Sequence, residues 1–131
     1  MRFLLDTNVM IAIMRSNHRV GERVRQNGNG TLGLSTIVLH ELYFGAYNSS
    51  RVAQNLASVR GIDMPIVDFN SEDAFAAGEI RAHLVAEGRM IGPYDLLIAA
   101  QATTRDLIIV THNTREFARV PGLRLEDWET G

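Results

Sequence analysis

The sequence predicts an α/β domain with a mostly parallel central sheet of about five strands flanked by helices. Short apolar segments alternate with longer amphipathic ones, which is the pattern of βα units joined by right-handed crossovers. Segment 107–110 is continuously apolar and partly β-branched, as expected of a strand that helices cover on both faces. We therefore expect this segment at the centre of the sheet.

The predicted elements follow one another closely along the chain. Strands are predicted over 2–5, 31–35, 65–69, 107–111 and 123–126. Helices are predicted over 8–14, 20–26, 37–47, 51–60, 72–87, 94–104 and 114–118. The polar breaks at 27–30 and 46–50 are too short to be interdomain linkers, so we expect residues 1–131 to form one domain.

Two helix starts carry explicit signals. Ser71 is a candidate N-cap, and Glu72 and Asp73 after it place negative charge at the positive end of the helix dipole. Pro93 suits the first position of the next helix, which places Asp95 in its opening turn.

Composition bounds the class of protein. No apolar run approaches the roughly 20 residues of a membrane span, and Asp6 interrupts the first one before a signal-peptide core forms, so we expect a cytoplasmic protein without membrane contact. The chain has no cysteine, which excludes thiolate metal sites and leaves oxygen and imidazole ligands. The net charge of -2 lacks the overall basicity of many nucleic-acid binders.

Three acidic residues interrupt apolar segments. Asp6 ends the run 2–5, Glu41 lies inside 37–44 and Asp95 precedes 96–100. An ionised carboxylate in apolar surroundings costs several kcal/mol unless a cation or hydrogen-bond donors offset the cost. Since the chain contains no lysine, a metal ion is the favoured partner, and oxygen ligands favour Mg²⁺ or Mn²⁺.

Topology predicts that these acids meet. Function in open parallel sheets gathers at the carboxyl ends of the strands, near the point where strand order reverses. Asp6 ends the first strand, and Ser35 ends the second and is placed to cap the helix that carries Glu41. Asp95 and Asn113 flank the fourth strand. We expect one pocket containing Asp6, Glu41, Asp95 and Asn113.

Each acid also has a structural interpretation that stays open here. Asp6 is a candidate N-cap, and Asp95 suits the dipole of its helix. Glu41 lies in a helix that is apolar nearly all round, where pairing with a buried arginine is the alternative to a metal.

The histidines and aromatic residues are assigned mainly to structure. The four histidines lack the HxH and HExxH spacings of metal sites, and His112 alone is placed to touch a substrate. Tyr43 and Phe44 fall at helical spacing and are expected in the core. Tyr47 and Tyr94 are candidates to stack a base, although nothing in the sequence requires it.

Four motifs occur in order along the chain: LDTN at 5–8, HELYFGA at 40–46, IGPYDLLIAA at 91–100 and VTHNTREF at 110–117. In this order and with these gaps they resemble the motifs of PIN-domain ribonucleases. Over the whole length, including the closing segment 120–128, the sequence is similar to the VapC toxins of bacterial toxin–antitoxin pairs.

The resemblance implies a Mg²⁺- or Mn²⁺-dependent endoribonuclease that cuts RNA, with tRNA, and initiator tRNA in its anticodon loop, as the expected substrate. It also implies inhibition by a small VapB-like antitoxin, whose C-terminal segment occupies a groove of the toxin and whose N-terminal part binds operator DNA. A homodimer and a toxin–antitoxin hetero-oligomer are expected.

The same resemblance implies roles for individual residues. Asp6, Glu41 and Asp95 match the acidic core, with Asp6 and Asp95 as direct ligands and Glu41 acting through water. The supporting hydroxyls match Thr7 and Thr111. The fourth acidic position of the family is occupied by Asn113, and Glu116, one helical turn onward, is a substitute for it.

Two other classes of protein stay open at this point. A phospho-accepting receiver module shares the length, the parallel sheet and an acidic Mg²⁺ pocket, but such modules carry a lysine that this chain lacks. A non-catalytic PIN-like binding protein would use the same acids to clamp arginines of a partner.

Overall fold

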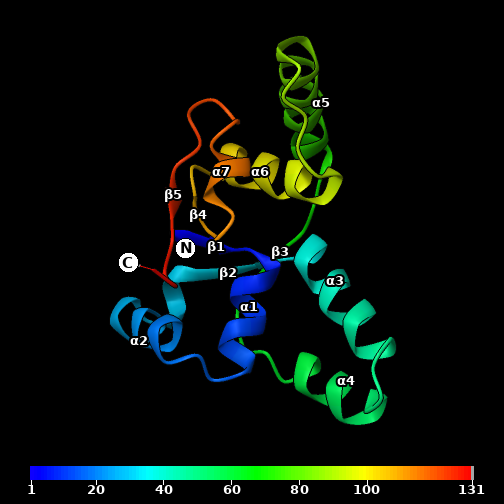
Figure 1. Ribbon diagram of the computed structural model, residues 1–131, viewed down its shortest axis with the longest axis vertical. Helices are drawn as coiled ribbons and strands as arrows, with labels where there is room; N and C mark the ends of the chain where they lie inside the picture. Colours follow the sequence, from blue (N-terminus) through cyan, green and yellow to red (C-terminus); the bar gives the residue numbers. More distant parts are fainter. Residues whose placement is uncertain (131) are drawn as a thin grey trace.

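The computed structural model describes residues 1–130, apart from the side chain of Asn29, and in this part five strands form one parallel sheet (Figure 1). The strands are β1 (Phe3–Leu5), β2 (Leu32–Ser35), β3 (Ile66–Val67), β4 (Ile108–Val110) and β5 (Leu125–Glu126). Their order across the sheet is β3-β2-β1-β4-β5, and every neighbouring pair is parallel. The predicted fold class is confirmed, with β1 as the middle strand and β4 beside it.

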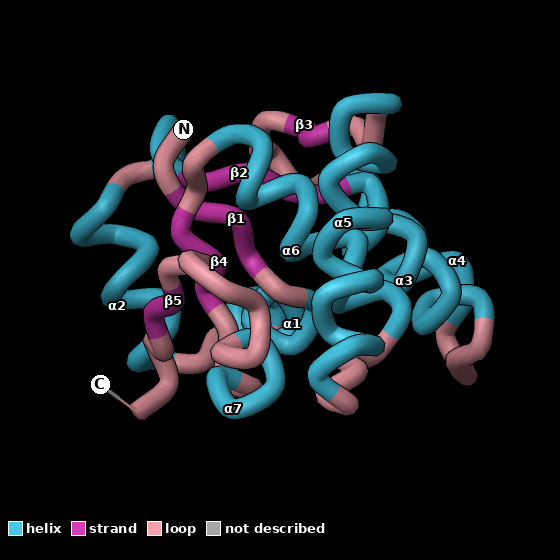
Figure 2. The backbone as a smooth tube through the Cα atoms, turned by 90° about the horizontal axis from the view of Figure 1, so that it is seen from above, coloured by secondary structure: helices cyan, strands magenta, loops and turns pink. Residues whose placement is uncertain are grey.

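Helices cover both faces of this sheet. They are α1 (Thr7–Met14), α2 (His18–Asn27), α3 (Thr36–Tyr47), α4 (Val52–Arg60), α5 (Ser71–Glu87), α6 (Pro93–Arg105) and α7 (Thr114–Phe117), with a 3₁₀ turn at Asn29–Thr31. Helices α1 to α4 lie on one side and α5 to α7 on the other (Figure 1), and the view from above shows α6 beside the strands with α5 beyond it (Figure 2). Among the described residues, no helix has the length and apolar character needed to span a membrane.

The interior strands supply the centre of the core. Leu4 and Leu5 of β1 and Ile109 and Val110 of β4 are fully buried, which confirms that segment 107–110 is covered on both faces. Trp128 packs edge-on against Phe3, with ring centroids 5.1 Å apart. This contact holds the C-terminal segment beside the N-terminus.

Two predicted strands are shorter than expected because their ends hydrogen-bond outside the sheet. The segment 65–69 pairs only at Ile66 and Val67, and the amide of Phe69 donates to the Thr36 hydroxyl at 3.2 Å instead. In the segment 123–126, the Leu123 amide closes a turn onto the Val120 carbonyl, so the strand begins at Leu125.

The predicted cap of α5 was wrong by one residue. Asn70, not Ser71, is the N-cap, because its side chain accepts from the Asp73 amide at 3.0 Å while the Asp73 carboxylate accepts from the Asn70 amide at 2.9 Å. This reciprocal pair satisfies two amides that the helix itself leaves unpaired.

The sequence suggested that α3 is apolar nearly all round and therefore buried, but the structure shows that it is only partly buried. Phe44 and Tyr47 are 66% and 63% exposed, so one face of the helix is open to solvent. The expectation that Phe44 lies in the core was wrong, while Tyr43 is half-buried against the core. Glu41 is half-buried as well.

Candidate active site

Asp6 is fixed at the point where strand order reverses, between β1 and β4. Its amide donates to the Val110 carbonyl at 3.0 Å, and one carboxylate oxygen accepts from the Thr7 amide at 2.7 Å as the N-cap of α1. The other oxygen accepts from the buried Thr111 hydroxyl at 2.8 Å. Asp6 is therefore a cap, as one interpretation held, and its second oxygen also anchors it to the end of β4.

Glu41 reaches the same sheet edge from α3. The Ser35 hydroxyl caps this helix by accepting from the Ile37 amide at 3.0 Å, and it donates to the buried side chain of Gln101. One Glu41 carboxylate oxygen accepts from the Thr7 hydroxyl at 2.8 Å. The partner of Glu41 is thus a hydroxyl that belongs to the first residue of α1, not the arginine of the structural interpretation.

Asp95 and Glu116 complete the acidic cluster. Asp95 lies in the first turn of α6, and its carboxyl group lies close enough to that of Glu116 for the two to interact. Glu116 also accepts a hydrogen bond from the Gly92 amide. A Cβ atom at Gly92 would lie 3.4 Å from an oxygen of each carboxylate, so both groups sit directly over this glycine.

The two residues that the sequence offered for the fourth position, Asn113 and Glu116, lie side by side at the cluster. Asn113 is exposed, and its side-chain amide donates to Glu116 at 2.5 Å. The Asn113 backbone amide donates to the Thr111 hydroxyl at 2.9 Å. The structure therefore brings Asp6, Glu41, Asp95 and Glu116 together and places Asn113 beside them as a holder of Glu116.

Burial and repulsion among the acids raise the pKa values of Asp6 and Asp95. Burial raises the pKa of Asp6, and the charges of Glu41 and Glu116 raise it further against the opposing hydrogen bonds. Burial, followed by the charges of Asp6 and Glu116, raises the pKa of Asp95 to about 7. Despite its own burial, Glu116 has a lowered pKa because the Gly92 amide and the Asn113 side chain donate to it. In the metal-free protein, Asp95 therefore titrates near neutral pH.

A divalent cation fits this donor set. All the side-chain groups are oxygen donors of the kind that Mg²⁺ and Mn²⁺ prefer, and a cation would offset the repulsion that raises the pKa of Asp95. Within residues 1–130, the one trio of His, Asp or Glu side chains whose ligand atoms all lie within 4.8 Å of each other is His112, Asp127 and Glu129. An ion at the acidic cluster would therefore bind few carboxylates directly and keep several waters, as Mg²⁺ commonly does.

His112 points away from the cluster. Its Nδ1 atom lies 3.0 Å from an Asp127 carboxylate oxygen and 3.7 Å from one of Glu129, so the ring pairs with the C-terminal segment. The expectation that His112 touches a substrate stays a prediction, because the ring is exposed and the partners it has in the structure are acids of the C-terminal segment.

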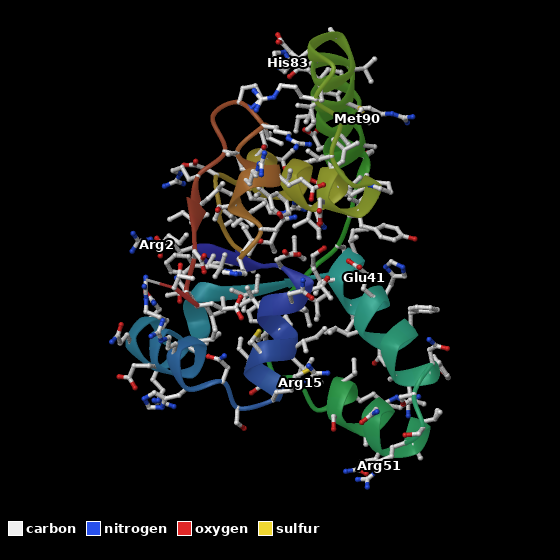
Figure 3. All side chains as sticks on the ribbon, viewed as in Figure 1. Arg2, Arg15, Glu41, Arg51, His83 and Met90 are labelled. Atoms are coloured by element: carbon white, nitrogen blue, oxygen red, sulfur yellow. The ribbon has the colours of Figure 1, made fainter. Side chains whose placement is uncertain are left out.

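A groove with a volume of about 370 Å³ begins at Glu41 and runs between α1, α3 and α4. Apolar residues line much of it, with Arg15 and Glu41 among the charged ones (Figure 3). Glu41 lies midway along α3 and belongs both to the groove and to the acidic cluster, so the groove adjoins the cluster.

Sequence reasoning missed two residues that hold the site in place. Gln101 is fully buried, accepts from Ser35 and donates to the Val67 carbonyl at 3.0 Å, which ties the start of α3 to α6 and β3. Its signal was available, because a polar residue inside the apolar run 96–102 is the same kind of anomaly as Glu41. Gly92 gave no comparable signal.

Comparison with known proteins assigns the family. Residues 3–123 match the family model described as PIN domain. The chain is 44% identical over 131 residues to the tRNA(fMet)-specific endonuclease VapC of Shigella flexneri, covering 98% of each chain. It is also similar to a chain in the crystal structure of DNA-bound VapBC from Salmonella typhimurium, with a TM-score of 0.92, 40% identity and 98% of each chain covered.

A further solved structure, VapBC2 from Rickettsia felis bound to a DNA fragment from their promoter, matches with a TM-score of 0.87 and 33% identity over 98% of this chain and 99% of that chain. The protein belongs to the PIN-domain family and, within it, to the VapC ribonucleases. PIN-domain nucleases generally use divalent metals, in agreement with the donor set described above.

Proposed function

We propose that this protein is a Mg²⁺- or Mn²⁺-dependent endoribonuclease toxin that cuts tRNA, with initiator tRNA as its preferred substrate. The observation that carries the proposal is the cluster of Asp6, Glu41, Asp95 and Glu116 at the switch point of the sheet, in a chain 44% identical to a tRNA(fMet)-specific endonuclease. Four acids gathered without a cation repel one another, whereas with a divalent ion they form a phosphate site.

Each residue has a distinct part in this proposal. Asp6 and Asp95 hold the ion directly and Glu41 holds it through water, with Glu116 as the fourth acid. A bound divalent ion supplies positive charge at the phosphate and lowers the pKa of a water. The Thr7 and Thr111 hydroxyls keep the carboxylates of Glu41 and Asp6 in fixed orientations.

The decisive experiment is cleavage of initiator and elongator tRNA transcripts by the purified protein. We expect cleavage with Mg²⁺ or Mn²⁺ and none in EDTA. Asp6→Asn should lower the rate about a thousandfold or more, since the charge that holds the ion is lost. Asp63→Asn is the matched control, because Asp63 is exposed outside the cluster.

Two outcomes would count against the proposal. If the wild-type protein cuts no RNA with either metal, it is a non-catalytic PIN-like binding protein. If Asp6→Asn and Asp63→Asn cut equally well, cleavage arises from a contaminating nuclease. Equal cleavage of all tRNAs would remove the substrate preference and leave the nuclease.

We also propose that a VapB-like antitoxin inhibits the protein by placing its C-terminal segment in the groove beside Glu41 and that its N-terminal part binds operator DNA. The apolar lining and the charged Arg15 and Glu41 suit an amphipathic peptide. Replacing the groove residue Gly45, which is exposed and has open space around its Cβ position, by Trp should weaken inhibition by the antitoxin encoded beside the toxin. Unchanged inhibition would place the antitoxin elsewhere.

Homodimerisation stays a prediction that light scattering tests.

A further inference from the structure

Two aromatic rings from different helices meet beside the acidic cluster. His40 of α3 and Tyr94 of α6 form a T-shaped pair, with ring centroids 4.8 Å apart and an interplanar angle of 67°. His40 directly precedes Glu41, and Tyr94 directly precedes Asp95. Because consecutive helical residues do not face the same way, the rings flank the acids and do not cover them.

The pair is held in place but is not part of the core. His40 is exposed and Tyr94 is 47% exposed. The His40 Nδ1 atom lies 2.7 Å from the Ile37 carbonyl oxygen, which can only accept, so Nδ1 carries the proton and the ring is oriented by its own helix. Tyr94 is the second residue of α6, whose start is set by Pro93. Two exposed rings are thus kept together by backbone structure.

We propose that the His40–Tyr94 pair is a stacking platform for one unpaired base next to the phosphate that the acidic cluster binds. This inference rests on the proposed function. The rim of the site carries the acidic side chains of Glu41 and Glu116, and ionised carboxylates repel phosphates that are not at the metal. A base is neutral, so aromatic stacking holds the strand there without that repulsion.

The platform also accounts for the kind of RNA that the site accepts. A base stacked in a duplex has no free face for a protein ring, whereas a loop base can be splayed out and stacked on aromatic side chains. A platform beside the reacting phosphate therefore selects single-stranded loops over stems. It determines the position of the cut within a loop and does not take part in the chemistry.

The test uses full-length protein made inactive by Asp6→Asn and an anticodon stem-loop of initiator tRNA that carries 2-aminopurine at each loop position in turn. Binding should quench the fluorescence at one position, because the base stacks on the pair. Adding Tyr94→Leu should remove the quenching and weaken binding about tenfold, within the range of about 5- to 150-fold that one stacked base provides. His40→Leu should act in the same direction, and Tyr94→Phe, which keeps the ring, should retain the quenching.

An abasic nucleotide at the quenched position tests whether the base itself contacts Tyr94. If Tyr94 only stabilised the fold, the effect of removing the base would not depend on Tyr94. The abasic nucleotide should weaken binding by the Asp6→Asn protein but cause little further loss when Tyr94→Leu is also present, since the interaction is already gone. Phe75→Leu is the control, because Phe75 is an 80% exposed aromatic residue on α5, outside the site.

Equal losses from the abasic nucleotide in both proteins would overturn the platform. A change of molecular mass on Tyr94→Leu, measured by light scattering, would instead show that the pair is a contact between copies of the chain. The two proposals fail separately: wild-type protein that cuts no RNA defeats the nuclease, whereas active protein in which Tyr94→Leu leaves binding unchanged defeats only the platform.

Discussion

Asp6 and Asp73 are both aspartates with less than a tenth of their surface exposed, yet their surroundings are opposite in charge. Asp73 accepts from the Arg105 guanidinium at 2.7 and 3.0 Å and from the Thr104 hydroxyl at 2.6 Å, and these donors lower its pKa despite burial. Asp6 has one amide and one hydroxyl donor and lies among three other acids, and burial raises its pKa.

The difference lies in where the cation comes from. At Asp73 the cation is Arg105, which is part of the chain, so the cluster is complete when the protein folds. Among residues 1–130, no arginine forms an ion pair with Asp6, Glu41 or Asp95. Asp73 and its cation Arg105 join α5 to α6, whereas the acids of the cluster have no arginine partner among these residues.

The largest expected effect is on the free energy of unfolding, which should fall when the Asp73–Arg105 pair is broken but not when an acid of the active-site cluster is removed. Asp73→Asn should lower the free energy of unfolding by about 3 kcal/mol, because it leaves Arg105 without its buried partner. Asp95→Asn should leave the metal-free protein as stable or more stable, since it removes one of four mutually repelling acids. Urea denaturation of both variants in EDTA measures the difference. Equal losses would show that Asp95 is a structural acid as well.

Binding of a metal ion should stabilise the protein through the acidic cluster. Manganese at a hundred times its dissociation constant should stabilise the wild-type protein by about 2.7 kcal/mol. Asp95→Asn should lose this gain, and the exposed control Asp63→Asn should keep it. Thermal melts with and without Mn²⁺ provide the measurement. A gain that survives Asp95→Asn but disappears with His112→Ala would move the ion to the trio of His112, Asp127 and Glu129.

The fold and the acidic core could be predicted from the sequence because both leave local signals. The alternation of apolar segments determined the parallel sheet, and polar interruptions at Asp6, Glu41 and Asp95 pointed to the sheet edge where they meet. Strand ends were less predictable. Whether Phe69 donates to the sheet or to Thr36 depends on a helix 33 positions away, and no local pattern contains that information.

Other features that the sequence did not reveal also depend on contacts between distant segments. His112 turns toward Asp127, fifteen residues later, and Phe44 is exposed although its neighbours in the sequence are apolar. Whether Glu116 joins the acids also depended on three-dimensional packing, since the sequence offered both Asn113 and Glu116 for the fourth position. The Gly92 amide, in the segment before α6, and the Asn113 side chain both donate to Glu116 and hold it in the cluster.

The pH dependence of stability should have opposite signs at the two clusters. The pKa of Asp95 rises from its ordinary 3.8 to about 7 in the folded protein, so its contribution is fully present below pH 4 and is lost as the pH rises through 7. The pKa of Asp73 is lowered, so its contribution is present above pH 4 and is lost only as the pH falls below that value.

Between pH 5 and 8 the raised pKa of Asp95 should therefore lower the stability as the pH rises, and the raised pKa of Asp6 acts in the same direction. The metal-free protein should lose about 1 kcal/mol over this range, after allowance for water around a half-exposed group. Melting temperatures in EDTA at both pH values measure this loss, and Asp95→Asn should remove most of it. A melting temperature that rises from pH 5 to pH 8 in the wild-type protein would contradict the raised pKa.

The smallest expected effect concerns Asn113. Its side chain donates to Glu116 from an exposed position, and one such hydrogen bond is worth about 0.5 to 1 kcal/mol, or roughly a threefold change in rate. Asn113→Ala should therefore slow RNA cleavage about threefold, and Glu116→Gln should slow it more, because that change removes a charge from the cluster. If Asn113→Ala proves as damaging as Glu116→Gln, the carboxamide contacts the ion or the substrate itself, and Asn113 rather than Glu116 is the fourth residue of the site.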